Sequence, residues 1–227
     1  MNTPAKCPTS TAELPPSGNP CFGCNGCSSP ASGSGATISV IGGISAAHDY
    51  GLEYDHADLL IFTKVSDSDL GGGPRHFDDK HGGIVSRTIN ESGFRGEVQE
   101  VLEVELPSVG PSARTRRIAV IGLGRAQGVT RKSMCGLFNQ ALALAHRHNA
   151  HSLLIPVFPW RTSAAALNLK ATGAILRCLV EERKRRGTLG NLQEITLLST
   201  PQARRHIEAG LAVEHTLCSV CRIPNLF

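Results

Sequence analysis

Residues 116–149 contain the pattern that most narrows the possible folds of this chain. Residues 118–121 form a short apolar run with mainly β-branched side chains, which predicts a strand buried on both faces. The run ends in Gly122-Leu123-Gly124, and Thr130 suits the N-cap of a helix whose apolar residues recur at steps of three and four. Asn149 suits the left-handed position that closes this helix, and residues 153–158 form a second apolar run. A strand, a helix and a strand in this order imply a right-handed crossover, a parallel sheet and an α/β fold.

The rest of the globular region is predicted from similar patterns. Val and Leu alternate with Glu in residues 98–106, which is typical of a half-exposed strand near a sheet edge. Thr200 and Pro201 suit the start of a helix. The other predicted strands are residues 37–41, 58–65 and 194–198, and the other predicted helices are residues 77–90 and 162–186.

Composition divides the chain into three parts. Residues 1–36 are rich in Pro, Ser, Thr and Gly and hold few aliphatic side chains, so we expect an extension that cannot build a core of its own. Residues 37–212 are expected to form the globular domain, and residues 213–227 a C-terminal tail. No apolar run approaches the ~18 residues of a membrane span, and no leader is visible. We therefore expect a soluble intracellular protein of the cytoplasm or an organelle matrix, with the compartment left open.

Residues 92–107, SGFRGEVQEVLEVELP, together with RRIAVIGLG at residues 116–124 and the helix after it, carry a family resemblance. This order of elements resembles the N-terminal domain of the leucine aminopeptidase (M17) family, a variant of the macro-domain fold. The resemblance covers roughly residues 37–210. It implies a three-layer, macro-domain-like, mixed but mostly parallel sheet with helices on both faces.

The family's peptidase chemistry belongs to a second domain, with two metal ions held by Asp, Glu and Lys and an NTDAEGR-type loop. Nothing in this sequence matches those motifs, and paired-metal hydrolysis needs clustered carboxylates. Aminopeptidase activity is therefore not expected. The first hypothesis is a non-catalytic structural or interaction subunit of a larger assembly, with protein partners.

The second hypothesis is an ADP-ribose or nucleotide binder or hydrolase. The glycines of residues 70–73, with His81-Gly82-Gly83 after them, resemble the first loop with which macro domains hold ADP-ribose, and Asp49 would then face the adenine. Glycines let backbone N–H groups approach a diphosphate at a helix N-terminus. A tight-turn role is the alternative. The candidate cofactor-binding residues are Gly71, Gly72, Gly73 and Asp49.

The cysteines predict a metal site. Thiolates spaced as C-x-x-C can chelate one ion, and chain termini often lie close together, so the two ends could share a tetrahedral zinc clasp. An iron–sulfur cluster, disulfides and free thiols are the alternatives. The candidate ligands are Cys21, Cys24, Cys27, Cys218 and Cys221, with Cys7 as a further possible ligand. Cys135 and Cys178 lie on apolar helix faces and are expected in the core.

The third hypothesis is an RNA- or ribosome-associated subunit. Arg183, Lys184, Arg185 and Arg186 form a basic run at a predicted helix end, and Arg204 and Arg205 form a second pair. The alternative is a solvated helix end that favours the helix dipole. The histidines show no spacing typical of a nucleophile–base pair, and a base role for His81 is a minor hypothesis.

Overall fold

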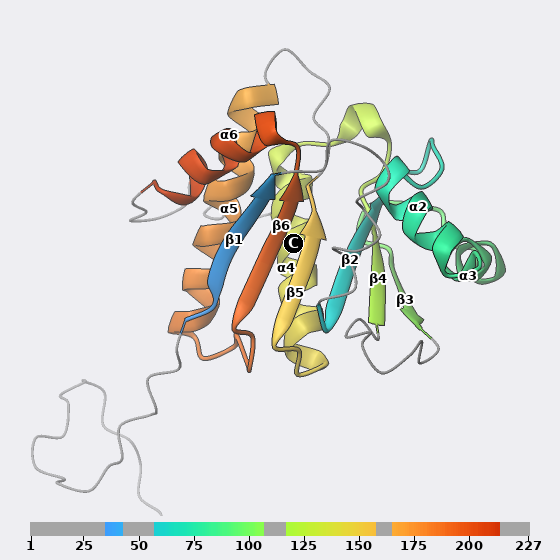
Figure 1. Cartoon of the computed structure of the whole chain (residues 1–227), viewed down its shortest axis with the longest axis horizontal. Coiled ribbons are helices and arrows are strands. Elements are labelled where there is room, and N and C mark those ends of the chain that lie inside the picture. Colours follow the sequence, from blue (N-terminus) through green and yellow to red (C-terminus); the bar gives the residue numbers. More distant parts are fainter. Residues whose placement is uncertain (1–34, 43–56, 107–116, 158–164, 214–227) are drawn as a thin grey trace, which may run out of the picture. The chain divides into compact units, whose positions relative to one another are not determined.

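Six strands form one mixed sheet, with five α-helices and one 3-10 helix in the described part of the chain (Figure 1). The structure is a computed structural model that describes residues 35–42, 57–106, 117–157 and 165–213. The strands are β1 (Thr37–Gly42), β2 (Leu59–Lys64), β3 (Val101–Glu105), β4 (Arg117–Gly122), β5 (Ser152–Pro156) and β6 (Glu194–Ser199). The helices are α2 (Gly72–Lys80), α3 (Ile84–Ser92), η2 (Ala126–Gly128), α4 (Arg131–Arg147), α5 (Ala165–Arg185) and α6 (Pro201–Leu211).

The strand order is β1-β6-β5-β2-β4-β3, and every neighbouring pair is parallel except β3 with β4. This confirms the predicted mostly parallel α/β sheet, and β3 lies at an edge as its alternating sequence predicts. β3 begins three residues later than predicted, because Val98 and Gln99 form a turn. In this turn Glu100 N donates to the Glu97 carbonyl (3.1 Å), and Gln99 has a φ of 72°.

Alternate residues of the central strands face two separate cores, so the domain has three layers. Leu59 and Ile61 of β2 pack in a core with buried residues of α4, α5 and α6. Leu60 and Phe62 pack in a second core with buried residues of α2 and α3. Strands that are apolar at every position are therefore needed in the centre of the sheet.

The strand–helix–strand unit matches its prediction closely. Thr130 caps α4 in a reciprocal capping box with Ser133, and Asn149 has a φ of 53° after the helix ends. The α4 residues that recur at helical spacing are buried, and Cys135 is buried among them. Thr200 accepts a hydrogen bond from Ala203 N and caps α6, as predicted.

The single helix predicted for residues 77–90 is wrong, because two helices occupy this region. α2 begins earlier, at Gly72, and ends before Gly82 and Gly83, whose φ values of 67° and 73° break the helix. The side chain of Asp78 then accepts hydrogen bonds from Val85 N (2.7 Å) and Ser86 N (3.2 Å) at the start of α3. A buried carboxylate of one helix thus supplies the N-terminal capping bonds of the next helix.

No helix in the described ranges is long and apolar enough to cross a membrane. The predicted N-terminal extension and C-terminal tail lie outside the described residues, apart from residues 35, 36 and 213 at their borders.

Two glycines allow α5 and α6 to pack with their backbones in contact. A Cβ placed on Gly173 would lie 2.2 Å from the carbonyl oxygen of Ile207, and a Cβ on Gly210 would lie 2.0 Å from the carbonyl oxygen of Lys170. Real Cβ atoms do not approach backbone that closely. Any side chain at these positions therefore has to push the two helices apart.

We predict that Gly173→Ala lowers the free energy of unfolding by about 1–3 kcal/mol, because the added methyl overpacks the α5–α6 contact. Gly136→Ala is the matched control, since Gly136 lies in α4 with no neighbouring atom within 4 Å of an added Cβ. That control should raise the free energy of unfolding by about 0.5–1 kcal/mol through helix propensity. Urea unfolding of both variants measures the difference, and equal effects would contradict the close packing.

Candidate functional site

The carboxyl ends of β2 and β5 mark the place where the connections of the sheet diverge. The chain runs from β2 toward β3 and β4 at one side, and from β5 toward β6 at the other. In open α/β sheets, ligands bind at such a switch point. β2 pairs with β5 only at Leu59–Leu153 and Leu60–Leu154, whereas its register with β4 covers the whole strand. The ladder between β2 and β5 therefore stops well before the carboxyl edge.

Asp58 joins these two strands at their amino ends. Its carboxylate accepts hydrogen bonds from His151 N (2.8 Å) and Ser152 N (3.0 Å), and its own N–H donates to Ser152 Oγ (2.8 Å). Among the described residues, the hydrogen bonds between these two strands lie toward their amino ends, and the candidate site lies at the other end.

The predicted glycine loop lies at this carboxyl edge, where α2 begins. Gly71 occupies the N-cap position with a φ of −61°, and no side chain caps the helix. None of Gly71, Gly72 and Gly73 has a positive φ, and an added Cβ on Gly71 or Gly72 would meet no atom within 4 Å. Neither turn geometry nor close packing therefore requires glycine at Gly71 or Gly72. Both glycines are exposed at a helix N-terminus, where the first backbone N–H groups have no partner within the helix.

His81-Gly82-Gly83 does not belong to this loop. It lies at the other end of the nine-residue α2, about 13 Å away along the helix axis. The ring of His81 stacks on the ring of Phe77, with 4.1 Å between centroids. His81 is thus held against the core at the end of the helix farther from Gly71.

The remaining predicted site residues lie outside the described residues. Asp49 belongs to this group. The predicted metal ligands outside the described residues are Cys7, Cys21, Cys24, Cys27, Cys218 and Cys221. Within the described ranges, no group of three or more His, Cys, Asp or Glu side chains is arranged to hold a metal ion.

The Gly-Leu-Gly motif after β4 is covered by the chain itself. A Cβ on Gly122 would lie 2.0 Å from the Glu97 carbonyl oxygen, and a Cβ on Gly124 would lie 2.7 Å from Val98 Cγ2. Gly124 N also donates to the Gly96 carbonyl (2.9 Å). These glycines therefore admit the segment 96–98 and not a diphosphate, which agrees with a strand-to-helix turn.

Two charged side chains beside this motif bind backbone groups. The ammonium of Lys64 donates to the carbonyls of Val65 (3.1 Å), Ser68 (3.1 Å) and Arg95 (3.4 Å). Asp67 Oδ1 accepts a hydrogen bond from Ala126 N (2.9 Å) at the start of η2. Both side chains join loops at the carboxyl edge to one another.

Glu100 closes the loop that covers the motif. Its Oε2 accepts hydrogen bonds from Glu97 N (2.9 Å) and Arg95 N (3.0 Å). The hydrogen bond from the Glu97 backbone is the largest of the effects that lower the pKa of Glu100, and the Arg95 and Gly96 backbone and the Arg95 charge act in the same direction. The ionised carboxylate thus stabilises the loop conformation.

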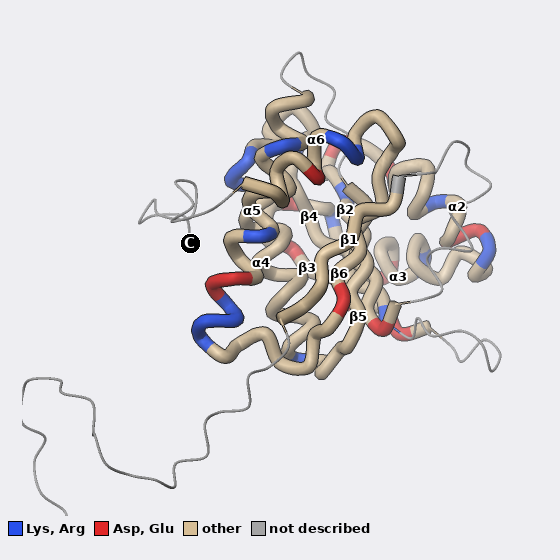
Figure 2. Tube along the Cα trace, turned by 60° about the vertical axis from the view of Figure 1, so that its left-hand side comes forward, with Lys and Arg blue, Asp and Glu red and all other residues tan. Residues whose placement is uncertain are grey.

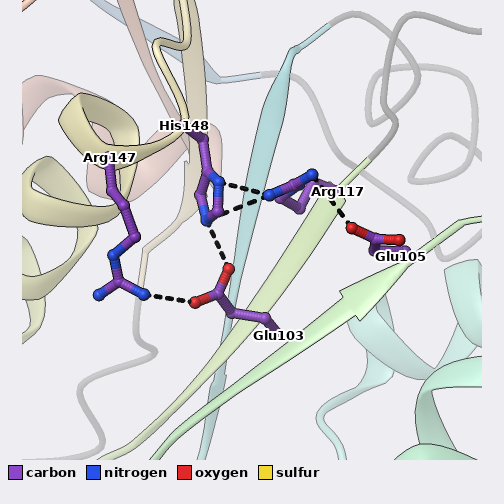
Figure 3. A network of polar contacts seen from close by, with 5 residues as sticks. All are labelled: Glu103, Glu105, Arg117, Arg147 and His148. Carbon is purple, nitrogen blue, oxygen red and sulfur yellow. Dashed lines mark hydrogen bonds and ion pairs between the residues drawn. The ribbon is translucent and has the colours of Figure 1, made fainter.

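A five-residue polar network lies at the opposite, amino end of β4 (Figure 3). Glu103 binds Arg147 Nη1 (2.8 Å) and His148 Nε2 (2.5 Å), and Arg117 contacts His148 Nδ1 and binds Glu105 (3.1 Å). Because Arg117 is a donor at Nδ1, the pattern assigns the proton of His148 to Nε2. The network ties the end of α4 to the edge strand. The sequence does not reveal this network, since Arg117 and Glu103 lie 31 and 45 residues from His148 along the chain.

The basic run at the end of α5 is largely occupied. Arg183 Nη2 donates to both the carbonyl (3.0 Å) and Oδ1 (2.8 Å) of Asn139, and burial lowers the pKa of Arg183. Arg185 and Arg186 both pair with Glu182. Among the described residues, Lys184 alone of the four has a side chain with no ion pair or hydrogen bond.

Comparison with known proteins identifies the domain. The model of the cytosol aminopeptidase family, N-terminal domain, matches residues 59–185, which is more than half of the chain. The chain belongs to this family. The match confirms the resemblance drawn from residues 92–124. A search of curated proteins gives no significant match.

Solved structures show the same fold for this family domain. A mutant of tomato leucine aminopeptidase aligns with a TM-score of 0.57 and 16% identity over 81% of this chain, and the chain spans 37% of that enzyme. A mutant macrodomain from Oceanobacillus iheyensis aligns with a TM-score of 0.53 and 13% identity, over 79% of this chain and 93% of that one. A Trypanosoma brucei macrodomain aligns with a TM-score of 0.54 and 11% identity, over 77% of this chain and 66% of that one. At these identities the structures show a macro-domain-like fold alone.

We predict that Glu100→Gln destabilises the domain near neutral pH but not in acid. A carboxylate with a lowered folded-state pKa stabilises above its ordinary pKa of 4.5, and this contribution is lost as the pH falls through the lower folded-state value. Glu97→Gln is the control, because it removes the same charge from the same loop. Urea unfolding at about pH 7 and about pH 3 measures the effect, and a wild-type-to-Gln difference at position 100 that persists in acid would contradict this role.

Proposed function

We propose that this family domain acts without peptidase chemistry, as a structural and interaction subunit of a larger assembly. The observation that supports this most is the engagement of charged side chains at the carboxyl edge. Lys64, Asp67 and Glu100 each bind backbone groups of the domain's own loops. A general acid or base must instead reach a substrate atom.

The metal chemistry of the family's peptidases supports the same proposal. Two-metal hydrolysis requires carboxylates that hold two ions about 3.5–4 Å apart. The described ranges contain no cluster of metal-binding side chains. In the tomato enzyme the matched region is a minor part of a longer protein. A domain of this fold can therefore function next to other domains or subunits.

The cysteine-rich ends would serve the assembly as a clasp. We propose that Cys21, Cys24, Cys27, Cys218 and Cys221, with Cys7 as a further candidate, supply thiolates for one zinc ion. Two C-x-x-C pairs complete a tetrahedral zinc site. An iron–sulfur cluster is the alternative that the same thiolates would support.

We expect the native protein to elute from gel filtration well above the size of a 24.1 kDa monomer, with zinc in the same fractions. In-line elemental analysis separates zinc from iron, and an absorption spectrum detects a cluster. The purified chain should not hydrolyse leucine amides when Zn²⁺ or Mn²⁺ is added. A free monomer in cell extracts, or metal-dependent hydrolysis by the pure chain, would refute the proposal.

A nucleotide-binding function is the second candidate, and the open glycines at the start of α2 favour it. Gly71 and Gly72 are free of packing and conformational requirements. α2 begins without a side-chain cap after the carboxyl end of β2, the side of the sheet that the β2–β5 ladder does not reach. An ADP-ribose diphosphate would accept hydrogen bonds from these backbone N–H groups.

Calorimetry with ADP-ribose distinguishes the two functions. The structural proposal predicts a Kd weaker than about 100 μM, equivalent to about −5.5 kcal/mol. Tighter binding that Gly72→Val abolishes would support the nucleotide site, because a β-branched side chain blocks the approach to the backbone. Gly136→Val is the control, since it places the same side chain in open space on α4.

A further inference from the structure

The two helical layers of the domain carry very different charge. α4, α5 and α6 hold ten Lys and Arg residues against three Glu, a net charge of +7 with His neutral. α2 and α3 hold three basic and three acidic residues, a net charge of zero. Figure 2 shows Lys and Arg in blue along α5 and α6, in the more basic of the two layers. The basic excess is thus concentrated on one face.

Side-chain contacts join these three helices into one continuous layer. Arg131 Nε donates to Asn168 Oδ1 (3.1 Å) between α4 and α5, and Arg183 binds Asn139 between the same helices. Arg177 binds the Leu211 carbonyl between α5 and α6. Arg204 pairs with Glu208 within α6. These cations have structural partners, so they contribute less to any outside ligand.

Four other cations of the layer remain for a ligand. All four side chains are exposed, and none takes part in an ion pair among the residues that the structure describes. Two of them lie on α5, fourteen residues apart, which corresponds to about 21 Å along the helix. The four residues are Lys132, Lys170, Lys184 and Arg205. Like charges on one helical layer repel one another, and an anionic ligand would offset this repulsion.

The surroundings of these cations favour nucleic acid over other anionic partners. Leu167 is the one large hydrophobic residue of α4, α5 and α6 that is strongly exposed in the described ranges. Membrane-bound helices need an apolar face to insert, and protein interfaces depend on buried aromatic and apolar anchors. A phosphodiester backbone requires mainly distributed positive charge.

We propose that the α4–α5–α6 face binds the phosphate backbone of nucleic acid without sequence preference. This inference rests on the proposed interaction function and names the partner class. It also differs from the sequence-based hypothesis, because Arg183, Arg185 and Arg186 are bound to Asn139 and Glu182. Lys132 and Lys170 join Lys184 and Arg205 as the exposed cations of the layer. Four phosphate contacts imply a slope of log K against log salt of about −2.8 for single strands and about −3.6 for duplexes.

Fluorescence anisotropy of the full chain across a salt series tests the proposal with three probes of equal length: single-stranded RNA, duplex RNA and duplex DNA. The double variant K170Q/K184Q should reduce the slope by about 1.4 for single strands and about 1.8 for duplexes. At about 0.1 M salt this weakens binding roughly 25-fold and roughly 60-fold, respectively. K80Q/R87Q, on α2 and α3, removes the same charge and should leave binding unchanged. The relative affinities of the three probes then show whether RNA or DNA is the source of the phosphates.

Three outcomes would overturn the proposal. They are the absence of binding at low salt, equal losses in the two double variants, and binding of poly-glutamate as tight as that of RNA, which would indicate an acidic protein partner. Each of these can occur while the native protein still elutes as a large, metal-bearing assembly. Failure of the nucleic-acid inference is therefore distinguishable from failure of the proposed subunit function.

Discussion

The contact between the Glu97 carbonyl and Gly122 determines much of the carboxyl edge of this domain. Because Gly122 has no side chain, the segment 96–98 lies directly on the end of β4. That position brings Gly96 O to Gly124 N and Arg95 O to the ammonium of Lys64. The loops after β2 and β4 and the turn before β3 are consequently held together by backbone hydrogen bonds. A side chain larger than hydrogen at position 122 would separate all three.

This arrangement links the fold to the proposed function. In many α/β proteins the glycines and charged residues that follow the strands bind a ligand, but here Lys64, Asp67 and Glu100 bind the protein itself. Charged residues of these types therefore hold loops of the domain to one another. The exposed chemistry of the domain lies elsewhere, in the open glycines that begin α2 and in the basic helical layer.

Patterns confined to one segment predicted the fold well. The apolar runs of β2 and β4, the alternation in β3 and the capping sequence of α4 all depend on neighbouring residues, and each matches the structure. The break at Gly82 and Gly83 was missed because a helical apolar pattern continues on both sides of it. The capping of α3 by Asp78 and the contacts of Gly173 with α6 could not be predicted, since they depend on how separate helices meet.

The same distinction applies to the candidate site. The composition of residues 67–73 predicted a loop before a helix at residue 77, whereas α2 already begins at Gly72. The sequence also could not show that a Cβ on Gly71 or Gly72 would meet no atom within 4 Å. The basic run at the end of α5 looks uniform in the sequence. In the structure Asn139 and Glu182 bind three of its four cations. Glu182 is a local partner in the same helix, whereas Asn139 could be identified only after α4 and α5 were packed together.

The short ladder between β2 and β5 has a mechanical consequence. It divides the six strands into two groups of three, β1-β6-β5 and β2-β4-β3. In the described part of the chain, these groups are hydrogen-bonded to one another at two register positions and through Asp58. This ladder is the shortest of the five in the sheet, so a force across the sheet acts here on the fewest paired residues. Asp58 reinforces its amino end, which leaves the load at the carboxyl side to side-chain packing.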